Sequence, residues 1–386
     1  MGHRVILKLS VLAAGIAMLS AASASAMDVN IDGFGSAYYA ETFQKGLLPT
    51  NFSQGTAPDF THFSLIGLNV NSKINEQWSA AAQLVGKGST VGSIGNNFNI
   101  SAEYAYVQYK PMADWTVRAG RQRLPFFTAS EYINEHYLLP MREIPAIVYN
   151  LAPFATFDGV SVGKAFDVGM GKVNVAVFGG NPLLDKSLTG VTITGQNLYG
   201  ARVNWEGEGW RVRMQASQME EYANYSASGL TSTVTSAGTY TGRQTFLSAG
   251  YRWDKMNIVS WGEYVYRHAD NGTPNPHNGD SSFNKADGGY VLLGYRLGDW
   301  MPRYTFAHGE SVIALQPAAN MASHTVGVNY SVSPKVVLKA EYEHTSIANN
   351  NGTDANAGLV AGMTVQSGAT PATSADSAYV GVDFSF

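Results

Sequence analysis

Residues Trp210 to Ser217 read Trp-Arg-Val-Arg-Met-Gln-Ala-Ser, a strict alternation of apolar and polar side chains. Successive side chains of a β-strand point to opposite faces, so a strand over this stretch has one wholly apolar face and one wholly polar face. The apolar face carries Trp210, Val212, Met214 and Ala216. One such strand would fit a soluble sandwich, and the fold therefore depends on how often the pattern recurs.

The alternation recurs along the whole chain, whereas a helical period of 3.6 residues is hard to find. Clear repeats lie at residues 199–205, 247–253, 326–330 and 336–342. The sequence predicts sixteen strands, near residues 29–41, 60–72, 77–88, 98–110, 115–123, 154–165, 172–180, 196–206, 209–218, 243–253, 256–267, 288–298, 300–308, 322–332, 335–345 and 377–386. The strands near 60–72, 98–110 and 154–165 alternate poorly, so their faces are not assigned.

The connections between these strands are alternately short and long. Short ones include Glu206-Gly-Glu-Gly and Leu297-Gly-Asp-Trp, and long ones cover residues 219–241, 269–287 and 347–376. Six of the seven tryptophans lie at or beside short turns: Trp78, Trp115, Trp205, Trp210, Trp253 and Trp300. Short turns at one end, long polar loops at the other and an aromatic girdle are typical of a transmembrane antiparallel β-barrel, which is the predicted fold class.

The N-terminus predicts export. Arg4 and Lys8 precede a short apolar run, and Ala24-Ser-Ala26 matches an A-x-A cleavage site, so residues 1–26 are a predicted signal peptide. Residues 27–386 form the predicted barrel domain, whose charge is −6, because the precursor's −4 loses the two positive charges of the signal peptide. This acidic balance argues against a nucleic-acid partner.

The composition fits the same prediction. The chain has no cysteine, so its fold is not a disulfide scaffold. No stretch after residue 26 approaches the roughly 18 apolar residues of a helical membrane span. Its 41 glycines and 21 tyrosines, with only 14% charged residues, suit many strands joined by turns.

Two motifs resemble those of Gram-negative outer-membrane porins. The chain ends Tyr-Val-Gly-Val-Asp-Phe-Ser-Phe386, which resembles the signature read by the barrel-assembly machinery. Residues 117–126, Val-Arg-Ala-Gly-Arg-Gln-Arg-Leu-Pro-Phe, precede an irregular segment and then Ala152-Pro-Phe-Ala-Thr-Phe-Asp-Gly. This order is similar to the fifth strand, third loop and sixth strand of general porins, and especially to the phosphate-selective and dicarboxylate groups. The resemblance implies an outer-membrane homotrimer with one pore per subunit, surrounded by lipid and lipopolysaccharide.

The irregular segment, residues 124–153, is long for a loop without structure inside a compact domain. The resemblance implies that it folds into the lumen and narrows it, and the alternative is an external loop that covers the barrel mouth. Its charged residues include Glu131, Glu135, Arg142 and Glu143. Inside a wet lumen these acids would face basic wall residues and set a transverse field.

The polar faces of the strands predict the charge of the lumen wall. The basic residues on those faces are Lys87, Arg118, Arg202, Arg211, Arg213, Arg252, Arg267, Arg296, Arg303 and Lys339. The acids are Asp32, Glu263, Glu341, Glu343 and Asp383. A narrow channel focuses the field of its own lining, so this excess predicts a diffusion pore for small hydrophilic solutes with modest anion preference, for example for small organic acids or phosphate. If the arginines pair with the loop acids, the constriction is instead nearly neutral.

An enzymatic alternative finds little support in the sequence. Gly159-Val-Ser161-Val-Gly163 matches the G-x-S-x-G elbow, but that motif requires a following helix and another strand is expected here. The histidines have no spacing for a zinc site, so neither a metal nor another cofactor is predicted. A barrel hydrolase of the phospholipase or protease kind and a structural or adhesive barrel are the alternatives, and conductance in a bilayer would separate the pore from both.

Overall fold

A computed structural model of the chain describes residues 28–43, 47–49, 60, 63–88, 98–149, 151–152, 154–184, 191–225, 238–271, 285–311, 319–349, 363–365 and 374–386. The predicted signal peptide, residues 1–26, lies outside this part. The barrel strands are β1 (Asp28–Thr42), β3 (Leu65–Lys73), β4 (Trp78–Lys87), β5 (Asn99–Tyr109), β6 (Trp115–Arg123), β7 (Phe154–Val168), β8 (Gly171–Leu184), β9 (Val191–Gly207), β10 (Trp210–Tyr225), β11 (Gly238–Lys255), β12 (Ile258–Asn271), β13 (Lys285–Tyr295), β14 (Trp300–Ser311), β15 (Ala319–Ser333), β16 (Val336–Asn349) and β18 (Ser374–Ser385).

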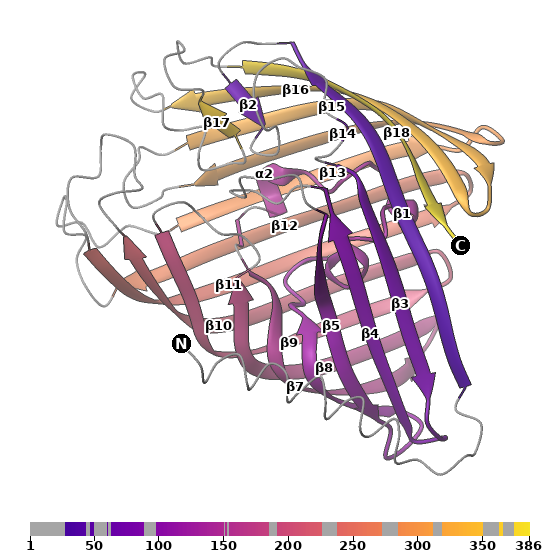
Figure 1. Cartoon of the computed structure of the whole chain (residues 1–386), viewed down its shortest axis with the longest axis vertical. Coiled ribbons are helices and arrows are strands. Elements are labelled where there is room, and N and C mark those ends of the chain that lie inside the picture. The colour runs from indigo at the N-terminus through magenta and orange to yellow at the C-terminus, as the bar shows by residue number, and fades with distance from the viewer. Residues whose placement is uncertain are drawn as a thin grey trace.

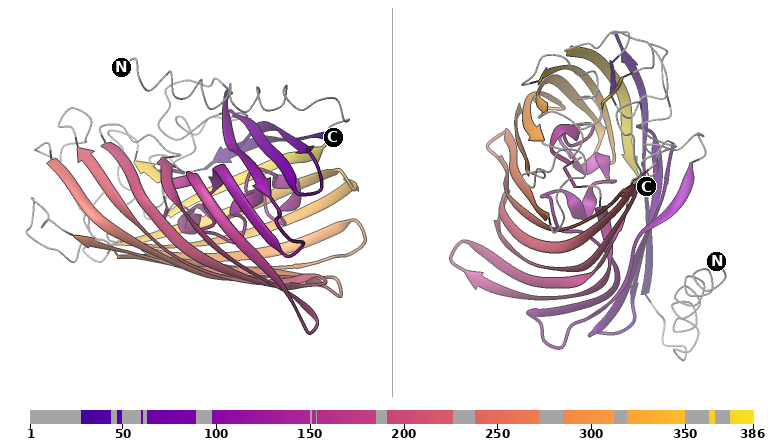
Figure 2. Two further views of the ribbon diagram at one scale, coloured as in Figure 1. Left: turned by 90° about the horizontal axis from the view of Figure 1, so that it is seen from below. Right: turned by 90° about the vertical axis from the view of Figure 1, so that its left-hand side faces the viewer.

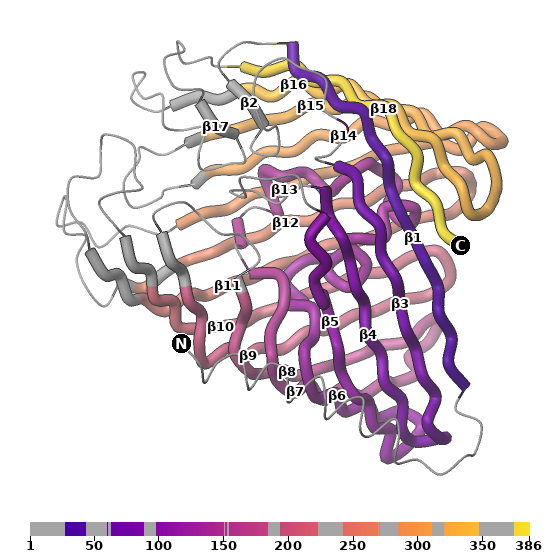
Figure 3. Tube along the Cα trace, viewed as in Figure 1, coloured from indigo at the N-terminus to yellow at the C-terminus, as the bar shows by residue number. Residues whose placement is uncertain are grey.

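These sixteen strands form one closed antiparallel barrel in which each strand pairs with its neighbours in the chain order. The first strand, β1, pairs with the last, β18, in the register Phe34 with Ser385 through Thr42 with Ser377, and this pairing removes both sheet edges. The two strands lie side by side in Figure 3. The predicted fold class and the count of sixteen are confirmed.

The strands at the long-loop end extend further than the sequence predicted. β10 continues to Tyr225 and β11 begins at Gly238, although residues 219–241 were expected to form a loop. Along this extension of β10 the outward side chains carry polar groups, as Glu220 and Tyr222 do. Apolar alternation is required only where the outer face meets lipid, so the pattern ends before the strand does. A small sheet of β2 (Leu47–Pro49) with β17 (Met363–Val365) was not predicted.

The three poorly alternating segments have specific explanations. β3 begins only at Leu65, whereas the sequence predicted a start near residue 60. The pairing of β4 with β5 shifts register between Gln83 and Leu84, where β5 has the extra residue Glu103. A bulge inserts one unpaired residue and reverses the apparent faces beyond it, which conceals the alternation in the sequence. In β7 each face is mixed in polarity, since the inward Phe157 is buried and the outward Asp158 is charged.

The outer face of the barrel is apolar. Exposed outward side chains include Val177, Met214, Val291, Leu293, Val326 and Val380. At the short-turn end the tryptophans pair with other aromatic rings: Trp78 stacks on Tyr109 at 4.6 Å, and the Trp205 and Trp210 rings are 5.0 Å apart. An apolar band with an aromatic girdle is the surface that a membrane-spanning barrel requires.

The C-terminal residue closes the barrel at its seam. Phe386 exchanges two backbone hydrogen bonds with Gly33, both 2.9 Å long. A Cβ atom on Gly33 would lie 2.1 Å from the Phe386 ring, so the absence of a side chain there is what admits the ring. The glycine and the terminal aromatic residue thus pack as a cross-strand pair on the outer face.

The segment between β6 and β7 lies inside the ring of strands, as both views of Figure 2 show. It contains two short 3₁₀ turns, η1 (Ser130–Tyr132) and η2 (His136–Leu138), and the short helix α2 (Ala146–Tyr149). The prediction that this loop folds into the lumen is confirmed, and the external alternative is wrong. No helix in the described part of the chain is long and apolar enough to cross a bilayer.

Candidate functional site

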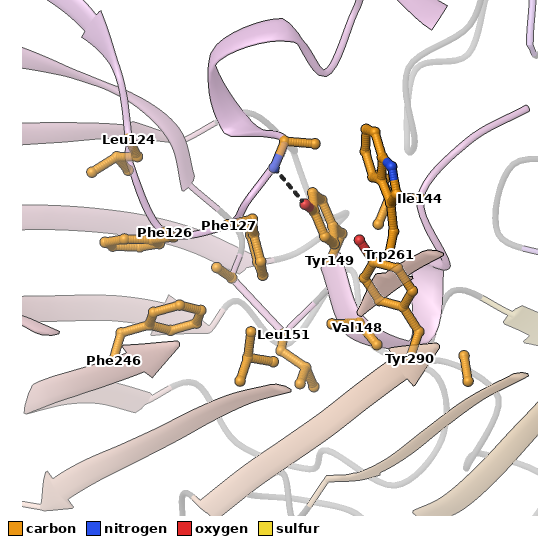
Figure 4. Packing of buried hydrophobic residues seen from close by; sticks show 14 of the residues in the cluster. Leu124, Phe126, Phe127, Ile144, Val148, Tyr149, Leu151, Phe246, Trp261 and Tyr290 are labelled. Carbon is orange, nitrogen blue, oxygen red and sulfur yellow. Dashed lines mark hydrogen bonds between the residues drawn. The ribbon is translucent and has the colours of Figure 1, made fainter. Parts of the chain in front are cut away.

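The inward loop, residues 124–152, packs an aromatic core against the inner wall of β10 to β14. Phe126 stacks on Phe246 of β11 at 4.5 Å, and Phe127 stacks on Tyr149 at 3.9 Å. Figure 4 shows these rings beside Trp261 and Tyr290, which project from β12 and β13. Each fully buried apolar side chain contributes roughly 1.5–3 kcal/mol, so this cluster is a substantial anchor for one side of the loop.

A buried carboxylate completes this anchor. Glu263 of β12 accepts hydrogen bonds from the Thr128 backbone N–H at 2.6 Å, from its hydroxyl at 3.0 Å and from the Tyr149 hydroxyl at 3.0 Å. On β10, the Arg213 guanidinium donates to the Pro125 carbonyl at 2.8 Å. The loop is therefore held here by both burial and directed hydrogen bonds.

The opposite side of the loop is held by buried ions. Lys339 of β16 donates from Nζ to the carbonyls of His136, Leu139 and Met141, at 2.8–2.9 Å, and pairs with Asp383 of β18 at 2.8 Å. The ammonium group of a lysine has three N–H donors, and here they share four oxygen partners. This one side chain thus ties the loop to the last two strands.

Glu341 of β16 binds the next part of the loop. It accepts from the Arg142 backbone N–H at 2.6 Å, and its oxygens pair with the guanidinium groups of Arg142, at 3.4 Å, and Arg303, at 2.5 Å. The Arg142 guanidinium also lies 4.0 Å from the ring centres of Phe63 and Tyr379. Arginine stacks on aromatic faces while it pairs with carboxylates, so Arg142 is fixed in position.

These contacts change the expected role of three wall residues. Arg213, Arg303 and Lys339 face the interior as predicted, but they are 1%, 4% and 2% exposed and are covered by the loop. They hold the loop in place and do not meet an open passage in this structure. Arg142 is likewise buried, which differs from its expected position at a constriction.

The other side of the interior remains accessible to solvent. Inward side chains of β5 to β11 that stay half-buried include Gln108, Arg118, Ser161, Arg202, Arg211 and Arg252. The loop residues Glu131, Tyr132, Glu135 and Tyr137 are half-buried too. The structure therefore packs the loop along β12 to β18 and leaves a more open side of the lumen along β5 to β11, where Arg213 and Phe246 are nevertheless covered by the loop.

The four arginines of the open side have different partners. Arg202 pairs closely with Glu131 of the loop, and Arg211 pairs with Glu206 at 2.5 Å. Arg118 donates to Gln108 at 2.9 Å, and Arg252 donates to the Tyr132 hydroxyl at 2.9 Å. Within the described residues, Arg118 and Arg252 thus have no carboxylate partner.

The loop acids are not equivalent. Arg202, and to a smaller degree Arg213 and Arg118, hold the pKa of Glu131 well below its usual range. Burial raises the pKa of Glu135, whose oxygens accept from neutral groups, with Gln83 at 3.1 Å and Tyr137 at 3.3 Å. Glu143 pairs with Arg142 inside the loop, at 2.8 Å. Only one loop acid, Glu131, therefore neutralises a predicted wall arginine.

The remaining predicted cations lie elsewhere. Arg296 is at the short-turn rim, exposed and paired with Asp254 at 2.5 Å. Lys87 pairs with Glu103 at 3.4 Å, and Arg267 donates to the Leu151 carbonyl at 3.0 Å.

Sequence reasoning missed the inward tyrosines of β5, Tyr104 and Tyr106, because a bulge conceals the faces of that strand. Their spacing of two residues on a common face was the signal available in the sequence. Tyr132, the loop partner of Arg252, was missed as well.

The enzymatic motif has an ordinary strand environment. Ser161 lies within β7, pairs with Arg118 of β6 in register, and its hydroxyl donates to Gln122 Oε1 at 2.6 Å. No helix follows it, as the nucleophile elbow would require. In the part of the chain that the structure describes, no cluster of three or more His, Cys, Asp or Glu residues is arranged to hold a metal ion.

Solved structures share this architecture, although no family model and no curated protein sequence matches the chain. In-vitro folded OmpT of Vibrio cholerae, in its trimer form, is 12% identical with a TM-score of 0.59, over 94% of this chain and 100% of that one. The anion-selective porin from Comamonas acidovorans is 14% identical with a TM-score of 0.58, over 94% and 100% of the two chains. The outer-membrane channel DcaP of Acinetobacter baumannii is 13% identical with a TM-score of 0.59, over 94% and 99%. The closed sixteen-stranded barrel of this chain is the fold of the Gram-negative outer-membrane porins.

Proposed function

We propose that the chain forms a water-filled diffusion channel in a Gram-negative outer membrane, with modest preference for small anions. The observation that carries the proposal is the solvent-accessible lining beside the inward loop, where Arg118 and Arg252 have no carboxylate partner among the described residues. Low-dielectric walls focus the field of such a lining on whatever passes. The planar guanidinium fork suits carboxylates and phosphate, which favours small organic acids and phosphate as solutes.

The test is the reversal potential of the mature chain, residues 27–386, in a planar bilayer across a potassium chloride gradient. We expect the sign of the reversal potential to show that chloride permeates more readily than potassium. Replacing both Arg118 and Arg252 by Ala should move it toward the cation side. A matched control is Arg296→Ala, because Arg296 lies at the rim and is already paired with Asp254. Absence of conductance would refute the channel, and cation preference in the native chain would refute the selectivity.

The outer face carries a surface suited to further copies of the chain. Arg121 of β6 and Asp158 of β7 point outward and form a two-bond ion pair, at 2.9 and 3.2 Å. Charged groups facing lipid are costly, and a protein neighbour would shield them. We infer a homotrimer, since one structural neighbour is described in a trimer form. Crosslinking of the purified protein in detergent tests this, and a monomer only would contradict it.

Two further partners belong to the same proposal. The terminal Phe386 is the residue that the barrel-assembly machinery would read, and export would depend on the signal peptide of residues 1–26. Outer-membrane lipid and lipopolysaccharide would surround the apolar band.

A further inference from the structure

Two aromatic rings line the open side of the lumen beside an arginine. Tyr104 and Tyr106 of β5 point inward with ring centres 5.7 Å apart, and both are half-buried. The Arg118 guanidinium lies 5.0 Å from the centre of the Tyr106 ring. Its Nε donates to Gln108, and its two terminal amino groups have no hydrogen bond to a described residue. Arg118 is thus oriented by stacking and one hydrogen bond, with its fork left free for an anion.

The loop presents a second arrangement of the same kind. The Arg252 guanidinium lies 5.4 Å from the Tyr132 ring centre and 5.2 Å from that of Trp261. Tyr137, also half-buried, donates to Glu135 at 3.3 Å. Glu135 shares Asn69 as a partner with Tyr104 of the wall, so one hydrogen-bonded network links Tyr137 of the loop to Tyr104.

Arg118 and Arg252, the two open-side arginines without a carboxylate partner, are therefore both accompanied by aromatic faces. Chloride or phosphate uses only the charge of such a pair. A planar aromatic acid interacts with both the arginine and the tyrosine, because its carboxylate pairs with the guanidinium group while its ring packs against the tyrosine ring. A saturated acid of equal size and charge has no π-face to stack, so it gains less from the tyrosines.

Resting on the proposed channel function, we propose that the lumen binds planar aromatic carboxylates in preference to saturated carboxylates of the same size and charge, through Arg118 with Tyr106 and Arg252 with Tyr132.

The experiment compares two dianions that do not cross lipid, terephthalate and trans-1,4-cyclohexanedicarboxylate, as blockers of the potassium chloride current through the mature chain in a planar bilayer. We expect terephthalate to block at a concentration about three- to tenfold lower, the size expected of aromatic pairing. Tyr106→Leu should remove much of this difference. Arg118→Lys keeps the charge but loses the planar fork, so it should keep chloride preference and lose discrimination.

The matched control is Tyr295→Leu, which removes an exposed outward tyrosine of β13 and should leave the discrimination unchanged. Heat-modifiable migration in gels checks that each variant is folded. Equal block by the two dianions in an anion-preferring native channel would overturn this inference and leave the proposed function intact. Undiminished discrimination in both Tyr106→Leu and Arg118→Lys would also overturn it. A channel without conductance would refute both proposals.

Discussion

Neighbouring residues of one strand experience opposite environments. On β10, Arg213 is 1% exposed under the loop, whereas Met214 is 60% exposed on the outer face. The two side chains point to opposite sides of the sheet because side chains alternate along a strand. Inward side chains of the same strand also differ in their exposure. Arg213 is buried and donates to Pro125 of the loop, whereas Arg211 is only half-buried.

We expect Met214→Arg to lower the free energy of unfolding by roughly 2–4 kcal/mol, because it places a charge on the lipid face. The measurement is equilibrium unfolding in urea of the barrel refolded into lipid vesicles. The matched control is Asn174→Arg on β8, where an inward, half-buried side chain already bonds to Glu206 at 3.3 Å. A similar loss of stability in both variants would show that the faces are assigned wrongly.

The loop acids predict how selectivity depends on pH. Of Glu135 and Glu131, Glu135 gains a proton first on acidification, because burial raises its pKa above the ordinary 4.5, while the arginine-paired Glu131 stays ionised. Loss of that negative charge leaves the wall arginines less compensated. We therefore expect anion preference, measured as reversal potential, to increase as the pH is lowered from neutrality.

The control for this titration is Glu135→Gln, which resembles the protonated carboxyl group. Its preference at neutral pH should already equal that of the acidified native channel, and it should then change little with pH. A pH response of native size in Glu135→Gln would assign the titration to another group.

At the scale of elements, the inward loop is attached by two different kinds of chemistry. Along β10 to β13 it is held by stacked aromatic rings and by Glu263, and along β16 and β18 by the buried Lys339 and Glu341. Removing one partner of a buried ion pair leaves an uncompensated charge, which costs roughly 3–5 kcal/mol. The loop is therefore fixed against the inner wall of the barrel on both sides.

We expect Lys339→Met to loosen the loop, because three loop carbonyls and Asp383 lose their donor together. The single-channel current should become noisier, and the melting temperature should fall. Lys335→Met is the matched control, since Lys335 is exposed in the turn before β16. A quiet current and unchanged melting in Lys339→Met would mean that this lysine does not hold the loop.

At the scale of the whole molecule, the barrel is completed only when the last strand pairs with the first. Phe386 bonds to Gly33 at that seam, and its ring occupies the space that the glycine leaves. We expect deletion of Phe386 to lower the amount of barrel inserted in cells much more than the yield of refolding into detergent. The reason is that only the cellular route depends on recognition of the terminal residue.

The measurement is heat-modifiable migration of membrane fractions and of refolded protein, side by side. A deletion variant that inserts normally in cells would contradict the role of the terminal phenylalanine. Phe386→Tyr keeps an aromatic terminus and is the control that should insert normally.

The sequence by itself determined the barrel, its sixteen strands and the outward faces of most of them. The outer face meets lipid along every strand, so each strand needs apolar side chains at alternate positions. This alternation can be recognised within eight residues, as at Trp210 to Ser217. Where a bulge interrupts the pairing, as at Glu103 in β5, local alternation fails and the inward tyrosines of β5 were missed.

Only the tertiary structure decided which inward charges remain accessible to solvent. Lys339 bonds to Leu139 across 200 positions of sequence, and Glu263 bonds to Thr128 across 135. Contacts at such separations depend on where the loop packs against the wall. The alternation of apolar and polar residues in the sequence does not predict that position. The division of the predicted wall into anchors, such as Arg303 and Lys339, and solvent-accessible groups, such as Arg118, follows from burial by a distant segment.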